Sequence, residues 1–132
     1  MTVKIDQAFT SAFITAAYGL QIAHENLPYV PTAGTPYAEL IIAQNDQSPL
    51  SITDSNETTG VFRVILRYPL ESGAIGIKTM GDTIATTFKI GTLLTYAGQS
   101  AKITRVGRDV GFTEAGWYKI VLTFTYWAYI AR

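Results

Sequence analysis

The hydrophobic positions of the chain first recur at helical spacing. From Ile5 to Ala23, apolar side chains return every three or four residues, which predicts an amphipathic helix over residues 3–23. Prolines and a glycine between residues 28 and 36 exclude regular structure, so we expect an extended connector there. The apolar run that follows, residues 37–43, predicts the first strand.

A polar stretch separates this strand from the next. Residues 44–60 consist mainly of Asn, Asp, Ser, Thr, Gln and Gly, so we expect a long loop that is mobile in the free protein and becomes ordered on contact with a partner. Alternation over residues 61–68 places Phe62, Val64 and Leu66 on one face and predicts a half-buried strand.

The second half of the chain predicts one more helix and three more strands. Ser72 is a suitable N-cap for a helix whose apolar side includes Ile77 and Phe88 and which stops at Gly91. Three further strands are predicted, over residues 93–96, 100–106 and 117–130. A turn joins the first two of them, and a loop over 107–116 joins the last two.

The order of elements is therefore α-β-β-α-β-β-β. This succession predicts an α+β fold, a largely antiparallel (mixed) sheet with both helices on one face. The other face of the sheet would carry an unusual number of large or apolar side chains: Ile41, Ile65, Val121, Thr123, Trp127 and Tyr129. We expect either the 44–60 loop or a neighbouring subunit to cover this face.

Composition limits the classes of function that remain. The chain has 132 residues and a mass of 14.4 kDa, which suits a single domain over residues 1–132. Cysteine is absent and His24 is the only histidine, which argues against disulfides, thiolate nucleophiles and histidine-based metal sites. Nucleotide-binding, hydrolase and metalloprotease motifs are absent. The sequence thus predicts no enzyme, no catalytic residue, no metal, no cofactor and no membrane-spanning segment.

The charges balance overall but are divided unequally along the chain. Ten Lys and Arg residues face ten Asp and Glu residues, for a formal net charge of zero. Residues 1–60 hold six acidic residues and one basic residue, whereas residues 61–132 hold four acidic and nine basic residues. This division favours contact between copies of the chain over capture of a polyanion. Alternatively, the charges of the two halves interleave on the folded surface.

Several segments, taken in order, resemble one protein family. They are H-E-N-L-P-Y-V-P at residues 24–31, T-P-Y at 35–37, G-V-F-R-V at 60–64, a helix enclosed by glycines at 76 and 91, and W-Y at 117–118. This ordered set resembles the tail terminator proteins of long-tailed bacteriophages, also called tail completion or minor tail protein U-like proteins.

The resemblance implies a structural virion protein, assembled in the host cytoplasm, that forms a ring, commonly a hexamer, on the last ring of tail-tube protein. There it would stop tube polymerisation and provide the surface that joins the filled head. Its partners would be its own copies, the tube protein and a head-completion or neck protein, while DNA would pass without sequence-specific binding. A neck or head-tail connector subunit and a monomeric ligand-binding domain are the alternatives.

The charge division assigns residues to such a ring. The expected contact joins acidic side chains of one subunit to basic side chains of the next: Glu39, Asp46, Asp54 and Glu57 to Arg63, Arg67, Lys102 or Arg105. Lys102, Arg105 and Arg108 recur at three-residue spacing and are also candidates for sparse positive charge facing the lumen, because DNA must pass there. Alternatively, these three side chains only keep the surface solvated.

Overall fold

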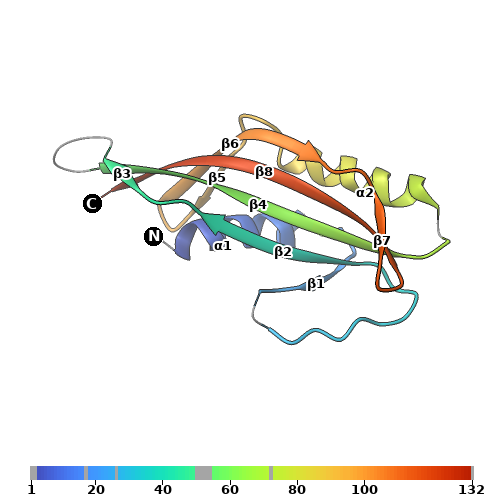
Figure 1. Cartoon of the computed structure of the whole chain (residues 1–132). Helices are drawn as coiled ribbons and strands as arrows, with labels where there is room; N and C mark the ends of the chain where they lie inside the picture. The colour runs from blue at the N-terminus through green and yellow to red at the C-terminus, as the bar shows by residue number, and fades with distance from the viewer. Residues whose placement is uncertain (1–2, 17, 26, 50–54, 72, 132) are drawn as a thin grey trace.

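A computed structural model describes residues 3–16, 18–25, 27–49, 55–71 and 73–131, which form the α+β fold that the sequence predicts (Figure 1). The elements of these residues, in chain order, are α1 (Val3–Ala16), β1 (Gln21–Ala23), β2 (Tyr37–Gln44), β3 (Ser48–Pro49), β4 (Ser55–Pro69), α2 (Ala74–Thr87), β5 (Leu93–Tyr96), β6 (Gln99–Arg108), β7 (Phe112–Glu114) and β8 (Trp117–Ala131). The short strands β1, β3 and β7 are additions to the predicted order.

The described strands form one mixed sheet. Its order is β1-β2-β4-β8-β6-β5, with β3 beside β4 and β7 beside β8. β1 and β2 run parallel, and the other pairs are antiparallel. β4 and β8 lie at the centre and pair over all 15 residues of each strand, from Ser55 opposite Ala131 to Pro69 opposite Trp117. This long pair forms the central ribbon of the molecule.

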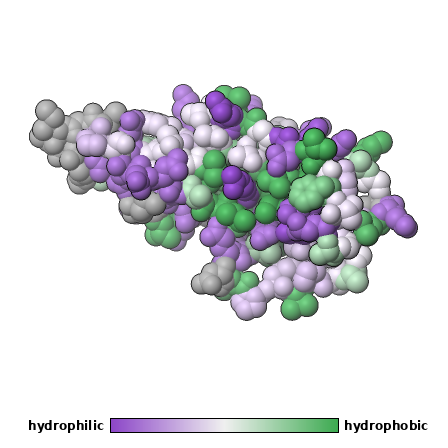
Figure 2. All heavy atoms as spheres, in the orientation of Figure 1, coloured by the Kyte–Doolittle hydropathy of each residue, from purple (hydrophilic) through white to green (hydrophobic). Residues whose placement is uncertain are grey.

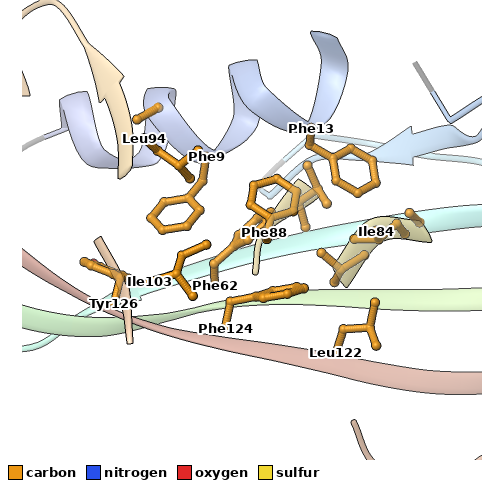
Figure 3. Packing of buried hydrophobic residues seen from close by; sticks show 14 of the residues in the cluster. Phe9, Phe13, Phe62, Ile84, Phe88, Leu94, Ile103, Leu122, Phe124 and Tyr126 are labelled. Carbon is orange, nitrogen blue, oxygen red and sulfur yellow. The ribbon is translucent and has the colours of Figure 1, made fainter. Parts of the chain in front are cut away.

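The core fills the space between the two helices and one face of the sheet (Figure 3). The Phe88 ring, at the end of α2, lies 5.3 Å from the rings of both Phe62 and Phe124. Phe9 of α1 packs 4.8 Å from Phe62. Further buried residues of this cluster include Ile5, Phe13, Val64, Leu66, Ile77, Ile84, Ile103, Ile120, Leu122 and Tyr126. The prediction that both helices cover the same face is confirmed.

The first helix is shorter than its apolar periodicity predicts. α1 ends at Ala16 rather than at residue 23, and Gly19 has a φ of 76°, a left-handed conformation that ends regular helix. The next residues become β1, which pairs with the beginning of β2. Leu20 has the spacing of the helical stripe but packs against the core from an extended segment. Strand pairing therefore overrides the local helical pattern.

The second helix also differs at its ends. Gly73 occupies the N-cap with a φ of 81° and makes no side-chain capping bond, and the expected cap, Ser72, lies outside the described residues. α2 ends at Thr87, and Phe88, at the C-cap, is fully buried in the core. Gly91 lies beyond the helix in a separate turn with a φ of 90°.

The predicted 44–60 loop is largely strand. Residues 48–49 form β3, and residues 55–60 extend β4 along the end of β8. Side chains supply further hydrogen bonds here: the Thr58 hydroxyl donates to the Asn45 carbonyl (2.8 Å), and the Asn45 amide donates to the Thr59 hydroxyl (2.9 Å). The prediction of a loop is wrong for these residues, because their polar side chains support the sheet. Residues 50–54 lie outside the described part.

Gly60 is required where the end of β4 passes beneath Tyr126. A Cβ at position 60 would collide with the carbonyl oxygen of Ala43 and would lie 2.7 Å from Cζ of Tyr126. The Tyr126 hydroxyl is buried without a hydrogen-bond partner among the described residues. Burial, with a smaller contribution from the charge of Asp6, raises the pKa of Tyr126. The tyrosine ring thus occupies the space that a side chain at position 60 would need.

We predict that Gly60→Ala lowers the free energy of unfolding by about 1–3 kcal/mol, because the added methyl overpacks this contact. Gly107→Ala is the matched control, since no atom lies within 4 Å of a Cβ at that strand position. The control should change stability by less than about 0.5 kcal/mol. Thermal and urea unfolding measure both variants, and equal losses for the two would contradict the proposed role of Gly60.

Candidate interaction surface

The face of the sheet opposite the helices, called the outer face below, is left uncovered by the core. The register that buries Phe62 and Phe124 turns the alternate residues, such as Ile65 and Val121, outward. Cross-strand rows on this face run from β2 through β4 and β8 to β6. In Figure 2, apolar residues gather in the middle of the molecule with polar residues around them.

The apolar side chains predicted for the outer face are only partly covered. Ile65 is buried, Tyr129 is 46% exposed, and the rest are intermediate: Ile41, Val121, Thr123 and Trp127. The 44–60 segment is not the cover, since its described residues lie mainly in the sheet itself. Residues 24–25 and 27–36, called the arm below, run outside the β1–β2 edge of the sheet on their way from β1 to β2 (Figure 1) and face one end of the outer face across a pocket.

Hydrogen bonds and aromatic contacts fix the arm against the sheet. The Glu25 carboxylate accepts a hydrogen bond from the backbone N–H of Ile42 (2.7 Å), at the open edge of β2. The Tyr29 hydroxyl donates to the side chain of Gln21 (2.7 Å), and its ring lies 4.9 Å from that of Tyr37. The arm is therefore attached both to the edge of the sheet and to its outer face.

A groove of about 800 Å³ opens between the arm and the outer face. Aromatic and charged side chains dominate its walls: Glu25, Tyr29, Tyr37, Glu39, Arg67, Glu114 and Trp117. Tyr37 packs edge-to-face on Trp117 at 5.2 Å between ring centroids. We call this feature the arm groove.

Arg67 organises the charges on the floor of the arm groove. Its guanidinium donates to the Glu39 carboxylate (2.7 Å), lies 3.7 Å from Glu114 and sits 5.5 Å above the Tyr37 ring. Glu114 also pairs with Lys119 at 3.2 Å. The four charges compensate one another within one subunit. The ion pair that the sequence predicts between Glu39 and Arg67 of adjacent subunits is thus made inside a single chain.

The remaining predicted interface residues lie at separate places. Asp46 is exposed just beyond β2, and Arg63 is exposed in the middle of the outer face. The Glu57 carboxylate accepts a hydrogen bond from Nε1 of Trp127 (2.9 Å). Asp54 lies outside the described residues. Whether these side chains contact a neighbouring subunit stays a prediction.

The three basic residues proposed for a lumen do not share one face. A β-bulge interrupts β6 between Ile103 and Arg105, so Lys102 opposite Trp127 and Arg105 opposite Thr125 both turn toward the outer face. Arg108 lies opposite Leu122 of the core face and is 3.5 Å from Asp82 of α2. Within the described residues, neither Lys102 nor Arg105 has an ion-pair partner.

Sequence reasoning did not find the arm groove. Glu25 and Tyr29 belong to the segment that carries the family resemblance, but their position against β2 depends on the tertiary fold. Glu114 and Trp117 face each other across a β7–β8 hairpin whose turn places Ala115 and Gly116 at φ values of 50° and 85°. The dipeptide Ala-Gly is a weak signal for such a turn, because alanine rarely adopts positive φ.

The described residues also bear on two other kinds of site. No group of three potential metal ligands occurs among them. No helix in the described part of the chain is long and apolar enough to cross a membrane.

The fold is a small α+β domain whose sheet has one covered face and one open face, and other proteins of known structure share it. One solved structure that is 16% identical superposes with a TM-score of 0.68 and covers 93% of this chain and 94% of that one. No curated protein matches the sequence. A family model described as "Phage tail terminator protein" matches residues 4–126. The chain belongs to this family and is a structural protein of a phage tail, a component of the virion.

We predict that Arg67→Met lowers the free energy of unfolding by about 1–2 kcal/mol, because it leaves Glu39 without its charged partner. The side chain of Arg67 is only 14% exposed, whereas Arg63, four residues earlier on the same face, is exposed and has no ion-pair partner among the described residues. Arg63→Met is therefore the control and should change stability by less than about 0.5 kcal/mol. Urea denaturation compares the two, and an equal loss would contradict a special role for the Arg67 network.

Proposed function

We propose that the protein assembles into a ring, commonly of six copies, on the last ring of the tail tube. There it stops the addition of tube subunits and provides the surface that joins a head-completion or neck protein. The observation that carries this proposal is the open outer face of the sheet, which has charged residues at its edges. The chain that presents this face belongs to the tail terminator family. A protein that works by contact needs such a surface, and a ring presents it repeatedly around one axis.

The arrangement of the sheet supports a head-to-tail contact between copies. Asp46 follows β2, toward one side of the sheet, whereas Lys102 lies on β6, toward the other side. Asn45 bonds to Thr59 of β4, which pairs with Trp127, and Lys102 also pairs with Trp127, so the two charges lie at nearly the same level along β8. We propose that Asp46 of one copy attracts Lys102 of the next.

We further propose that DNA passes through this ring without being read. The helices carry few basic residues, with Lys4 in α1 and Lys78 in α2, so neither offers a basic surface for the major groove. The two faces used by Lys102 and Arg108 also separate the positive charge of β6. Sparse charge would let the genome move past without strong retention.

Lys102→Glu should weaken self-association by about three- to tenfold, with a larger effect at low ionic strength, because exposed charges are screened by salt. Adding Asp46→Lys to the same chain should restore association, since the reversed pair is again complementary. Lys78→Glu, on α2, is the control with the same charge change away from the proposed edge. Sedimentation velocity over a salt series measures all four proteins. If Lys102→Glu assembles like the unaltered protein, this contact is refuted.

The termination function is tested by adding the protein to tube protein that is polymerising. Electron microscopy should show shorter tubes, with the added protein at one end of each, at ratios of about one ring per tube. The variant Lys102→Glu should need a higher concentration for the same effect. Tubes that continue to grow in the presence of the bound protein would contradict termination. A chain that remains monomeric with and without tube protein would favour a monomeric binding domain instead.

A further inference from the structure

The sheet has two open edges at the same level, meaning the same height along the direction of the strands. β1 pairs with residues 37–39 of β2, and β5 pairs with residues 99–102 of β6, so neither short strand covers the far part of its neighbour in the described structure. Through the registers with β4 and β8, residues 41–44 of β2 lie level with residues 123–126 of β8. Residues 105–108 of β6 lie level with residues 122–125.

A carboxylate occupies one of these edges, and an arginine lies at the other. Glu25 binds the N–H of Ile42, which is level with Phe124 of β8, while Arg105 lies opposite Thr125. The two side chains thus differ by about one residue in level. Both are exposed, and neither has an ion-pair partner among the described residues.

The charge of the arm groove favours a cationic occupant. Glu39, Arg67, Glu114 and Lys119 compensate one another, which leaves Glu25 as the carboxylate of the groove without a countercharge in the described residues. The aromatic rings of the groove lie at its other end, beside Tyr37, five residues along β2 from the Ile42 N–H that Glu25 binds. The countercharge for Glu25 can therefore come from an exposed basic side chain of a neighbouring copy.

We propose that the arm groove of one copy receives Arg105 from strand β6 of the next copy, where the guanidinium pairs with Glu25. This inference builds on the ring that we propose above and names the residues of its contact. Because Glu25 already satisfies the N–H of Ile42, the neighbour supplies a side chain here rather than an added strand. The assignment places Arg105 at the subunit interface instead of the lumen.

Two charge-neutralising variants test the pair without disturbing the arm. Glu25→Gln keeps an oxygen that accepts the Ile42 hydrogen bond but removes the charge, and Arg105→Gln removes the opposite charge. Each should weaken self-association by about tenfold, and the double variant should be no weaker than either single one, because both changes break the same pair. Lys78→Gln, on α2, is the control and should associate like the unaltered protein. Sedimentation velocity gives the association constants.

The absence of cysteine from the chain allows a direct test of proximity. Leu27→Cys places a thiol on the wall of the arm groove, and Gly107→Cys places one on β6, two residues from Arg105, which is kept. Mixing the two single variants and adding a short bis-maleimide should yield dimers that contain one chain of each kind. The mixture of Leu27→Cys with Lys78→Cys should give only background dimers.

The outcomes separate this contact from the proposed function. If the unaltered protein assembles and stops tube growth, but neither neutralising variant weakens assembly and the Leu27–Gly107 cysteine pair does not cross-link above background, the arm-groove contact is wrong and the function stands. If the unaltered protein stays monomeric even with tube protein and the tubes keep growing, the proposed function fails and the contact fails with it.

Discussion

The antiparallel pairing of β4 with β8 is the constraint on which the rest of the structure depends. Side chains alternate along both strands, so a single register decides that Phe62 and Phe124 enter the core while Ile65 and Val121 face outward. A slip of one residue would exchange the two faces along the whole ribbon. Tyr126 helps to exclude such a slip, because only a glycine fits opposite it, at position 60.

This register leaves the molecule with one face packed against helices and another that polar interactions must complete. Strands β2 and β7 provide such interactions at one end, where Arg67 is compensated by the carboxylates of Glu39 and Glu114 and lies over the Tyr37 ring. Burying a lone guanidinium there would be costly, so Arg67 depends on these carboxylates. Towards the middle of the face, Val121 and Thr123 remain half-buried, and no described segment crosses them. One end of the outer face is therefore covered, whereas its middle is open.

Much of this arrangement could be predicted from the sequence, because long alternating strands and a strong apolar core leave few options. Both helices, the central strands and the face that Phe62 and Phe88 share were predicted correctly. The errors arose where tertiary pairing overrode local pattern. Ala23 has helical spacing yet lies in β1, and the polar residues around Thr58 form strand because their side chains bond to neighbours. The arm groove was not predictable, since it joins residues as distant in sequence as Tyr29 and Trp117.

The open edges of the sheet require the most specific control, because unpaired strand edges invite indiscriminate pairing with other chains. Here the β2 edge carries a carboxylate that occupies the N–H of Ile42, and the β6 edge carries a bulge and the cationic Arg105. Both features discourage the addition of a foreign strand. Two β2 edges, or two β6 edges, also repel each other because they carry charges of the same sign. Opposite edges attract, so the same residues that protect the sheet also select one partner edge over another. Because the two edges differ, such a contact is head-to-tail, and repetition around an axis closes it into a ring.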